Sequence, residues 1–213
     1  MILSDLELLE IVSARLCHDL AGPVGAISNG LDFLRDEDNT MKDKAESLVE
    51  DSASQAVIRI QLFRYLYGTT LPAGEANLSN LKNLMEKFLI TSKMQLDWPE
   101  DNLFVQGIAI NHKTAKLILS MIMASSSFLL NAGSISVRLI NNNNKCRIEI
   151  SAKDKNIRIN QNSIDILDKQ VDKSAITNKN IHFYLIRRLS KLLNIDSFVE
   201  IKDQQADFIA QLP

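Results

Sequence analysis

The sequence predicts an α+β protein in which an antiparallel helical hairpin at the N-terminus precedes an α/β sandwich. Three observations indicate this. Residues 4–67 carry helical apolar periodicity with one short polar break. A Leu-Pro-Ala-Gly stretch follows at residues 71–74, and beyond it alternating apolar and polar runs, typical of strands, occur between helical segments. We therefore expect two domains, residues 1–70 and residues 76–213.

The first predicted helix begins at a capping box formed by Ser4 and Glu7 and runs to about Arg35. It would be roughly 45 Å long at 1.5 Å per residue. An apolar stripe follows one side of this helix and should face the core. The stripe contains Leu6, Leu9, Ser13, Leu16, Leu20, Val24, Ile27, Leu31 and Leu34.

The second predicted helix extends from an N-cap at Thr40 to about Tyr67, where Gly68 is the expected C-cap. The polar residues 36–39 form the turn before it. Apolar and small residues recur every three or four positions, so one face of this helix is apolar as well. A lone hairpin cannot cover both apolar faces, and we expect two copies to form a four-helix bundle. The protein should then be a homodimer.

The chain after residue 76 alternates between helical and strand patterns. Helices are expected at residues 78–91, 111–130 and 181–193, and strands at residues 102–105, 134–140, 146–152, 197–201 and 208–212. The four asparagines at residues 141–144 join two of these strands as a hairpin. This order predicts a largely antiparallel sheet covered by helices.

Composition restricts the possible functions. The 213 residues are 46% hydrophobic, which is enough to build a core, and the formal net charge is -2. Because there is no excess of basic residues to neutralise a phosphate backbone, we do not expect nucleic acid as a partner. The start of the chain is acidic, unlike a signal peptide, and no apolar run approaches the roughly 18 residues that a bilayer span needs. We expect a cytoplasmic protein that does not bind the membrane.

The cysteines and histidines do not indicate a metal site. Cys17 and Cys146 are far apart in the sequence, and we expect both to be reduced and buried. His18, His112 and His182 share no metal-ligand spacing with one another or with a cysteine. We therefore expect neither a metal nor a cofactor.

His18 is the candidate catalytic residue. On a helical wheel it falls about 160° from the centre of the apolar stripe, so its imidazole should face solvent. Glycine inside a helix costs about 1 kcal/mol relative to alanine, yet two glycines lie on this side. A flat surface around an exposed nucleophile would let another protein bring its active site to that nucleophile. The residues predicted to form this partner-binding surface are Ala21, Gly22, Gly25 and Asn29.

The residues around His18 resemble a known motif. The run Leu-Cys-His-Asp-Leu-Ala-Gly-Pro at residues 16–23 resembles the H-box of histidine kinases, in which a histidine, an acidic residue and a proline surround the phosphorylated imidazole. The longer run of residues 18–31 is similar to the signature of the ChpT-type histidine phosphotransferases. Weaker likeness extends to residues 134–137 and 185–189. The resemblance implies a dimerising helical hairpin followed by a degenerate ATPase-like domain of the histidine-kinase type.

The elements that hold ATP in a kinase are missing from the second domain. A kinase needs glycine-rich loops for the phosphates and an asparagine with acidic residues for magnesium. Beyond Gly74 the sequence contains only Gly107 and Gly133, and residues 121–127 read Met-Ile-Met-Ala-Ser-Ser-Ser where the kinase helix would carry its asparagine. We therefore expect the nucleotide site to be lost.

The resemblance implies a covalent phospho-carrier instead of an ATP-dependent kinase. His18 would be the nucleophile that takes a phosphoryl group from one response-regulator receiver domain and passes it to another, with magnesium supplied by the receiver. Asp19 either orients the imidazole or is a solvated helix charge. Two alternatives stay open, a catalytically inactive dimeric scaffold that binds receiver domains and an ATP-dependent histidine kinase with an unusual nucleotide site.

Overall fold

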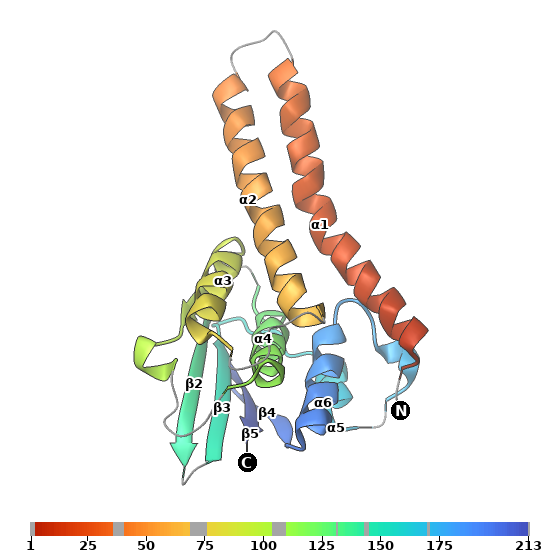
Figure 1. The fold of residues 1–213 in the computed structure, drawn as a ribbon, viewed down its shortest axis with the longest axis vertical. Helices are drawn as coiled ribbons and strands as arrows, with labels where there is room; N and C mark the ends of the chain where they lie inside the picture. Colours follow the sequence, from red (N-terminus) through yellow and green to blue (C-terminus); the bar gives the residue numbers. More distant parts are fainter. Residues whose placement is uncertain are drawn as a thin grey trace.

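A computed structural model describes residues 3–35, 41–68, 76–103, 110–130, 132–142, 145–169 and 171–212. The chain has the predicted α+β fold. A long helical hairpin rises from one end of a domain in which helices pack on a sheet (Figure 1). Within the described residues, no helix has the length and apolar character that a membrane span requires.

The hairpin consists of α1 (Asp5–Arg35) and α2 (Lys42–Tyr67), which lie side by side and antiparallel (Figure 1). The predicted capping box is confirmed, because the backbone N–H of Ser4 donates to Glu7 Oε2 at 2.6 Å and the backbone N–H of Glu7 donates to Ser4 Oγ at 3.3 Å. Thr40 and the turn at residues 36–39 lie outside the described residues.

Gly68 ends α2 as predicted, but for a different reason than a left-handed cap. Its φ of -67° is accessible to any residue, and its N–H donates to the carbonyl oxygen of Arg64 at 3.0 Å. A Cβ at this position would collide with that carbonyl oxygen. Glycine is therefore required here by close approach of the backbone.

Helices α1 and α2 are in close contact at Gly30. A Cβ placed there would lie 2.6 Å from Cγ2 of Val49 and 3.2 Å from the carbonyl oxygen of Ala45. A Cβ at Gly22 or Gly25 would meet no atom of the described chain within 4 Å. Packing inside the hairpin thus explains Gly30 but neither of the other two glycines.

This difference gives a stability prediction. Gly22→Ala should raise the free energy of unfolding by about 1 kcal/mol, because alanine is the better helix former and the added methyl group has open space. Gly30→Ala should lower it, because overpacking costs about 1–3 kcal/mol and offsets the same helix gain. Urea denaturation of the two variants checks the order. Equal stabilisation by both would show that α1 and α2 are not in close contact at Gly30.

Residues 76–212, called the second domain below, contain a five-stranded sheet with strand order β1-β2-β3-β5-β4, in which only β1 and β2 are parallel. The predicted, largely antiparallel sheet is confirmed. The elements are α3 (Leu78–Ile90), β1 (Gln95–Asp97), η2 (Glu100–Asn102), α4 (His112–Ser126), β2 (Ser134–Asn142), β3 (Lys145–Lys153), α5 (Gln161–Asp168), η3 (Lys173–Ala175), α6 (Ile181–Leu193), β4 (Ser197–Lys202) and β5 (Gln205–Gln211).

The strand predicted at residues 102–105 is wrong in its described part. Residues 100–102 form the short helix η2, and the strand lies earlier, at β1. The reason is that Asn102 reaches β2 through its side chain. Its amide donates to the carbonyl oxygen of Leu139 and accepts from the N–H of Leu139, which replaces a backbone ladder at this edge. Residues 104 and 105 lie outside the described residues.

The core of the second domain lies between the sheet and helix α4, which is buried along almost its whole length. Phe128, Phe183 and Phe208 form an aromatic cluster there, with ring centroids 5.7–5.8 Å apart. Cys146 on β3 is buried as expected, and burial raises its pKa to about 11. Cys17 is exposed, contrary to the prediction, because it lies on a side of α1 that α2 does not cover.

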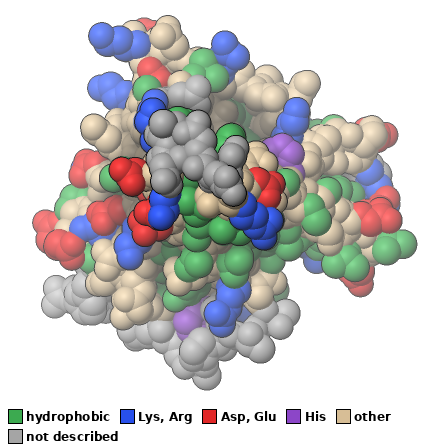
Figure 2. Space-filling model, turned by 90° about the horizontal axis from the view of Figure 1, so that it is seen from above, with side chains coloured by type: hydrophobic (Ala, Val, Ile, Leu, Met, Phe, Trp, Pro, Cys, Tyr) green, Lys and Arg blue, Asp and Glu red, His purple; other side chains and the backbone are tan. Residues whose placement is uncertain are grey.

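The predicted apolar stripe of α1 is only partly covered within one chain. Its inner side packs towards α2 and is half-buried, whereas its outer side stays open. In Figure 2, which looks down the hairpin, hydrophobic side chains gather near the middle of the view and extend from there to one side. The outer side is the part of the stripe that a second copy would cover in the expected four-helix bundle. The open apolar residues are Leu6, Leu9, Val24 and Leu31, with 42–65% of their surface exposed.

Candidate functional site

His18 lies on α1 with 68% of its side chain exposed, as the helical wheel predicts. Its Nδ1 is 3.0 Å from Oδ1 of Asp19. An ionised carboxylate can only accept a hydrogen bond, so Nδ1 must carry the proton in this contact. The lone pair of the neutral imidazole is then on Nε2, which is the nitrogen left free to react.

Asp19 is buried, with 7% of its side chain exposed, so the alternative that it is a solvated helix charge is wrong. Its Oδ2 lies 2.7 Å from Nε of Arg15, one helical turn earlier. The two groups form a close ion pair, although the N–H is not aligned for a hydrogen bond. Burial of a lone carboxylate would be costly, and the guanidinium compensates its charge.

Arg15 also contacts the second domain. Its Nη1 donates to the carbonyl oxygen of Asn178, in the segment before α6, at 3.3 Å. His182, in the first turn of α6, stacks on Tyr67 at the end of α2 with ring centroids 6.4 Å apart. The two imidazole nitrogens of His182 and the hydroxyl of Tyr67 are buried and have no hydrogen-bond partner among the described residues.

These surroundings keep His182 neutral. Burial, and to a smaller extent the positive charge of Arg15, lower the pKa of His182 to about 3. Burial likewise raises the pKa of Tyr67. The contact between α1, α2 and α6 is therefore a closed polar cluster whose permanent charges are those of Arg15 and Asp19.

The predicted partner-binding surface is open in the structure. Ala21, Gly22, Gly25 and Asn29 are all exposed on α1, beyond His18 along the helix. Helical spacing alone brings these four residues and His18 to one side. Sequence reasoning missed Arg15, Tyr67 and His182. The four-residue spacing of Arg15 and Asp19 could have revealed the first of them, but the other two come from distant parts of the chain.

At residues 125–127, near the end of α4, the serine side chains bond within their own helix. The hydroxyls of Ser125, Ser126 and Ser127 donate to carbonyl oxygens of their own helix, at 2.9, 2.9 and 2.6 Å. Gly133 has a φ of +106°, and a Cβ there would lie 2.8 Å from the carbonyl oxygen of Lys153. Gly133 thus serves the turn before β2.

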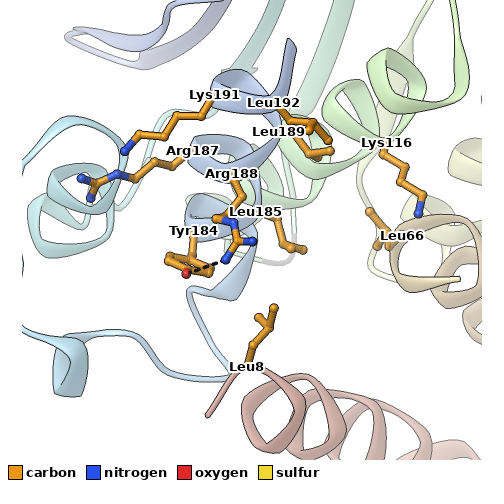
Figure 3. A pocket seen from close by; sticks show the side chains of 10 residues that line it. All are labelled: Leu8, Leu66, Lys116, Tyr184, Leu185, Arg187, Arg188, Leu189, Lys191 and Leu192. Carbon is orange, nitrogen blue, oxygen red and sulfur yellow. Dashed lines mark hydrogen bonds between the residues drawn. The ribbon is translucent and has the colours of Figure 1, made fainter. Parts of the chain in front are cut away.

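A groove of about 520 Å³ lies where the hairpin base meets α6, and Figure 3 shows basic side chains around its apolar floor. Three of these cations hold the structure together. Lys116 donates to the carbonyl oxygen of Gly68 after α2, Arg187 donates to carbonyl oxygens of α5 and of its C-cap, and Arg188 donates to the hydroxyl of Tyr184. Cations at helix C-termini are stabilising, and Lys116 thereby links α4 to the end of α2.

Fold and site together define the class of protein. A helical hairpin that presents an exposed, carboxylate-bound histidine beside a sandwich of kinase-like topology is the architecture of a histidine phosphotransfer protein. Residues 78–205, more than half of the chain, match the family model described as the histidine phosphotransferase C-terminal domain. The chain belongs to the histidine phosphotransferase family and is of the ChpT type.

Individual relatives agree with this assignment. The protein phosphotransferase ChpT of Brucella abortus (strain 2308) is 28% identical over 158 residues, which cover 74% of this chain and 72% of the relative. A solved bacterial phosphotransferase superposes with a TM-score of 0.83 at 22% identity, covering 99% of this chain and 98% of the other.

Two further structures share the fold at lower similarity. Full-length ShkA in complex with AMPPNP gives a TM-score of 0.51 at 12% identity, covering 96% of this chain and 45% of the other. The catalytic domain of histidine kinase ThkA gives 0.50 at 13% identity, covering 67% of this chain and 96% of the other. The predicted likeness of the second domain to a kinase domain is thus confirmed at the level of fold.

Proposed function

We propose that this protein relays a phosphoryl group between the aspartates of two response-regulator receiver domains through phospho-His18. The proposal rests on one observation: the side chain of His18 is exposed while its Nδ1 contacts the carboxylate of Asp19. A nucleophile that takes a phosphoryl group from another protein must reach into the active site of that protein. A histidine that projects from a smooth helix, with Nε2 free, meets this need.

The transfer can be written as a balanced exchange. The Nε2 lone pair of neutral His18 attacks the phosphorus of the receiver's aspartyl phosphate, and an N–P bond forms. The P–O bond to the aspartate breaks, and its electron pair returns to the receiver's carboxylate. The receiver would bring its own magnesium to neutralise the phosphoryl oxygens. Reversal of the same steps on a second receiver completes the relay.

Asp19 stabilises the charge that develops on His18. When Nε2 forms its bond to phosphorus while Nδ1 keeps its proton, the imidazole becomes positively charged. The carboxylate 3.0 Å away faces that charge directly. Because the carboxylate is already in place before the reaction, it requires little reorganisation as the charge forms.

We propose that ATP is not the phosphoryl donor. In support, the serine hydroxyls at the end of α4 are bonded to their own helix, and Gly133 serves a turn. The chain would thus keep the kinase framework without the groups that cradle phosphates and magnesium.

We propose that two copies associate through the open side of the α1 stripe. The exposed residues Leu6, Leu9, Val24 and Leu31 follow one side of the helix, away from His18. A second hairpin would cover them in a four-helix bundle and leave both histidines accessible. Sedimentation analysis should give a mass of twice the 23.9 kDa chain.

The relay is tested with receiver domains of the source organism, each phosphorylated with labelled phosphate. The chain should take up label from at least one of them and pass it to another. The label on the chain should be acid-labile and stable to base, as expected for phosphohistidine. Incubation with labelled ATP and magnesium alone should leave the chain unlabelled. Binding of receivers without label uptake would favour a scaffold, and labelling by ATP would favour a kinase.

Receiver docking is predicted to use the smooth surface beyond His18. Gly25→Arg should slow transfer at least about tenfold, equivalent to about 1.4 kcal/mol, because a long charged side chain occupies the space of the incoming receiver. Nothing in the described chain lies within 4 Å of a Cβ at this position, so the fold should be unaffected. Gly25→Ala is the matched control and should transfer at nearly the wild-type rate. Unchanged transfer by Gly25→Arg would place docking on another surface.

A further inference from the structure

The reactive helix is joined to the second domain at Arg15. Its guanidinium lies between two groups, since Nε is 2.7 Å from Oδ2 of Asp19 and Nη1 donates to the carbonyl oxygen of Asn178 at 3.3 Å. Arg15 is mostly buried, with 19% of its side chain exposed. The guanidinium is therefore held by two partners, one on α1 and one on the segment before α6.

Asp19 depends on this arginine for its orientation. Adjacent residues on a helix do not normally face each other, because their side chains point about 100° apart. Asp19 nevertheless reaches Nδ1 of His18 with one oxygen while its other oxygen faces Arg15. Two contacts on opposite oxygens fix the plane of the carboxylate, and a carboxylate with only one of them could rotate.

The surroundings keep this pair away from water. Tyr67 and His182, which stack on each other, lie close enough to interact with the charge of Arg15, and their polar side-chain atoms are buried. Because His182 is neutral, it does not compete with Arg15 for the carboxylate of Asp19. An ion pair shielded from solvent is stronger and less mobile than one on the surface.

From this arrangement we propose that Arg15 is a positioning residue for phosphoryl transfer, which fixes Asp19 and through it the Nδ1–H tautomer of His18, and which the second domain holds in place through Asn178. The proposal rests on the relay function proposed above. It assigns the degenerate second domain a part in the chemistry, since that domain carries one of the two anchors of Arg15.

Two measurements test the proposal on the 213-residue chain. The first is the ring-nitrogen spectrum of ¹⁵N-histidine-labelled protein, which reports the tautomer of His18 without any transfer. The wild-type protein should carry its proton on Nδ1. Arg15→Met keeps the apolar stem and removes the charge, and it should shift the population towards the Nε2–H form. Arg15→Lys keeps the charge and should restore the wild-type spectrum in part.

The second measurement is the rate at which a small donor, phosphoramidate, phosphorylates His18, which separates reactivity from receiver docking. Arg15→Met should lower this rate roughly 10- to 100-fold, the range expected when an interaction with a charged group is lost. Arg35→Met, on the exposed end of the same helix, is the matched control and should react like the wild type. Asp19→Asn should add little to Arg15→Met, since the two residues act as a unit.

The outcomes distinguish the two proposals. An unchanged tautomer and rate in Arg15→Met, while the wild-type protein accepts phosphate from receivers, would overturn the role of Arg15 alone. Failure of the wild-type protein to accept phosphate from any receiver would overturn the relay, whereas the tautomer shift would still report on Arg15. Additive losses in the double variant would also contradict the proposal, because they would show that Arg15 does not act through Asp19.

Discussion

His18→Ala should reduce phosphoryl acceptance from receiver domains to background. The imidazole of His18 is the only nucleophile in the proposed transfer, and the methyl group of alanine has no atom that can replace Nε2. Fold and assembly should be unaffected, because 68% of the side chain is exposed and the ion pair of Asp19 with Arg15 does not involve His18. A labelling assay with a phosphorylated receiver measures phosphoryl acceptance, and circular dichroism and sedimentation check the fold and the assembly.

The other two histidines provide the controls for this result. His112, at the start of α4, is half-buried with its Nδ1 enclosed, and His182 lies in the buried cluster, so neither projects from a helix into solvent as His18 does. His112→Ala should therefore accept phosphate like the wild type. Label on a well-folded His18→Ala protein would show that another residue is the acceptor and would contradict the assignment.

His182→Phe should remove a large part of the acid sensitivity of the fold. In the native protein the pKa of His182 is about 3, whereas in the unfolded chain it is close to 6.5. The unfolded state therefore binds a proton below pH 6.5 that the folded state does not bind until about pH 3. Stability from this group is fully present above pH 6.5 and falls as the pH decreases towards 3. At pH 5 the loss is about 2 kcal/mol.

The experiment compares urea unfolding of His182→Phe and wild-type protein at pH 7.5 and pH 5. Phenylalanine keeps a ring on Tyr67 and removes two buried nitrogens that lack partners, so the variant should be at least as stable as the wild type at pH 7.5. Its advantage should grow by about 2 kcal/mol at pH 5. The remaining titratable groups are the same in both proteins, so their contributions cancel in the difference between the two free energies of unfolding. Parallel pH dependence would mean that His182 is solvated or paired in the native state.

The hairpin and the exposed position of His18 could be predicted from sequence because both depend on local patterns. The capping box at Ser4 and the glycine after Tyr67 set helix ends, and the angular position of His18 set its exposure. The largely antiparallel character of the sheet followed from alternating runs, since strand patterns and a hairpin turn are local as well. The strand predicted at residues 102–105 was wrong because the side chain of Asn102 replaces backbone pairing at this edge of the sheet. The alternation of residue types does not reveal such a contact.

Sequence by itself determined the exposure of His18, the open surface formed by Ala21, Gly22, Gly25 and Asn29, and the resemblance to the phosphotransferase motif. Only the tertiary structure decided the burial of Asp19, because a residue next to an exposed histidine becomes buried only where another part of the chain covers it. That cover comes from Tyr67 and α6, and Asn178, 163 residues beyond Arg15, anchors the arginine. Contacts between such distant residues leave no local periodicity, and they arise only when the hairpin packs on the second domain.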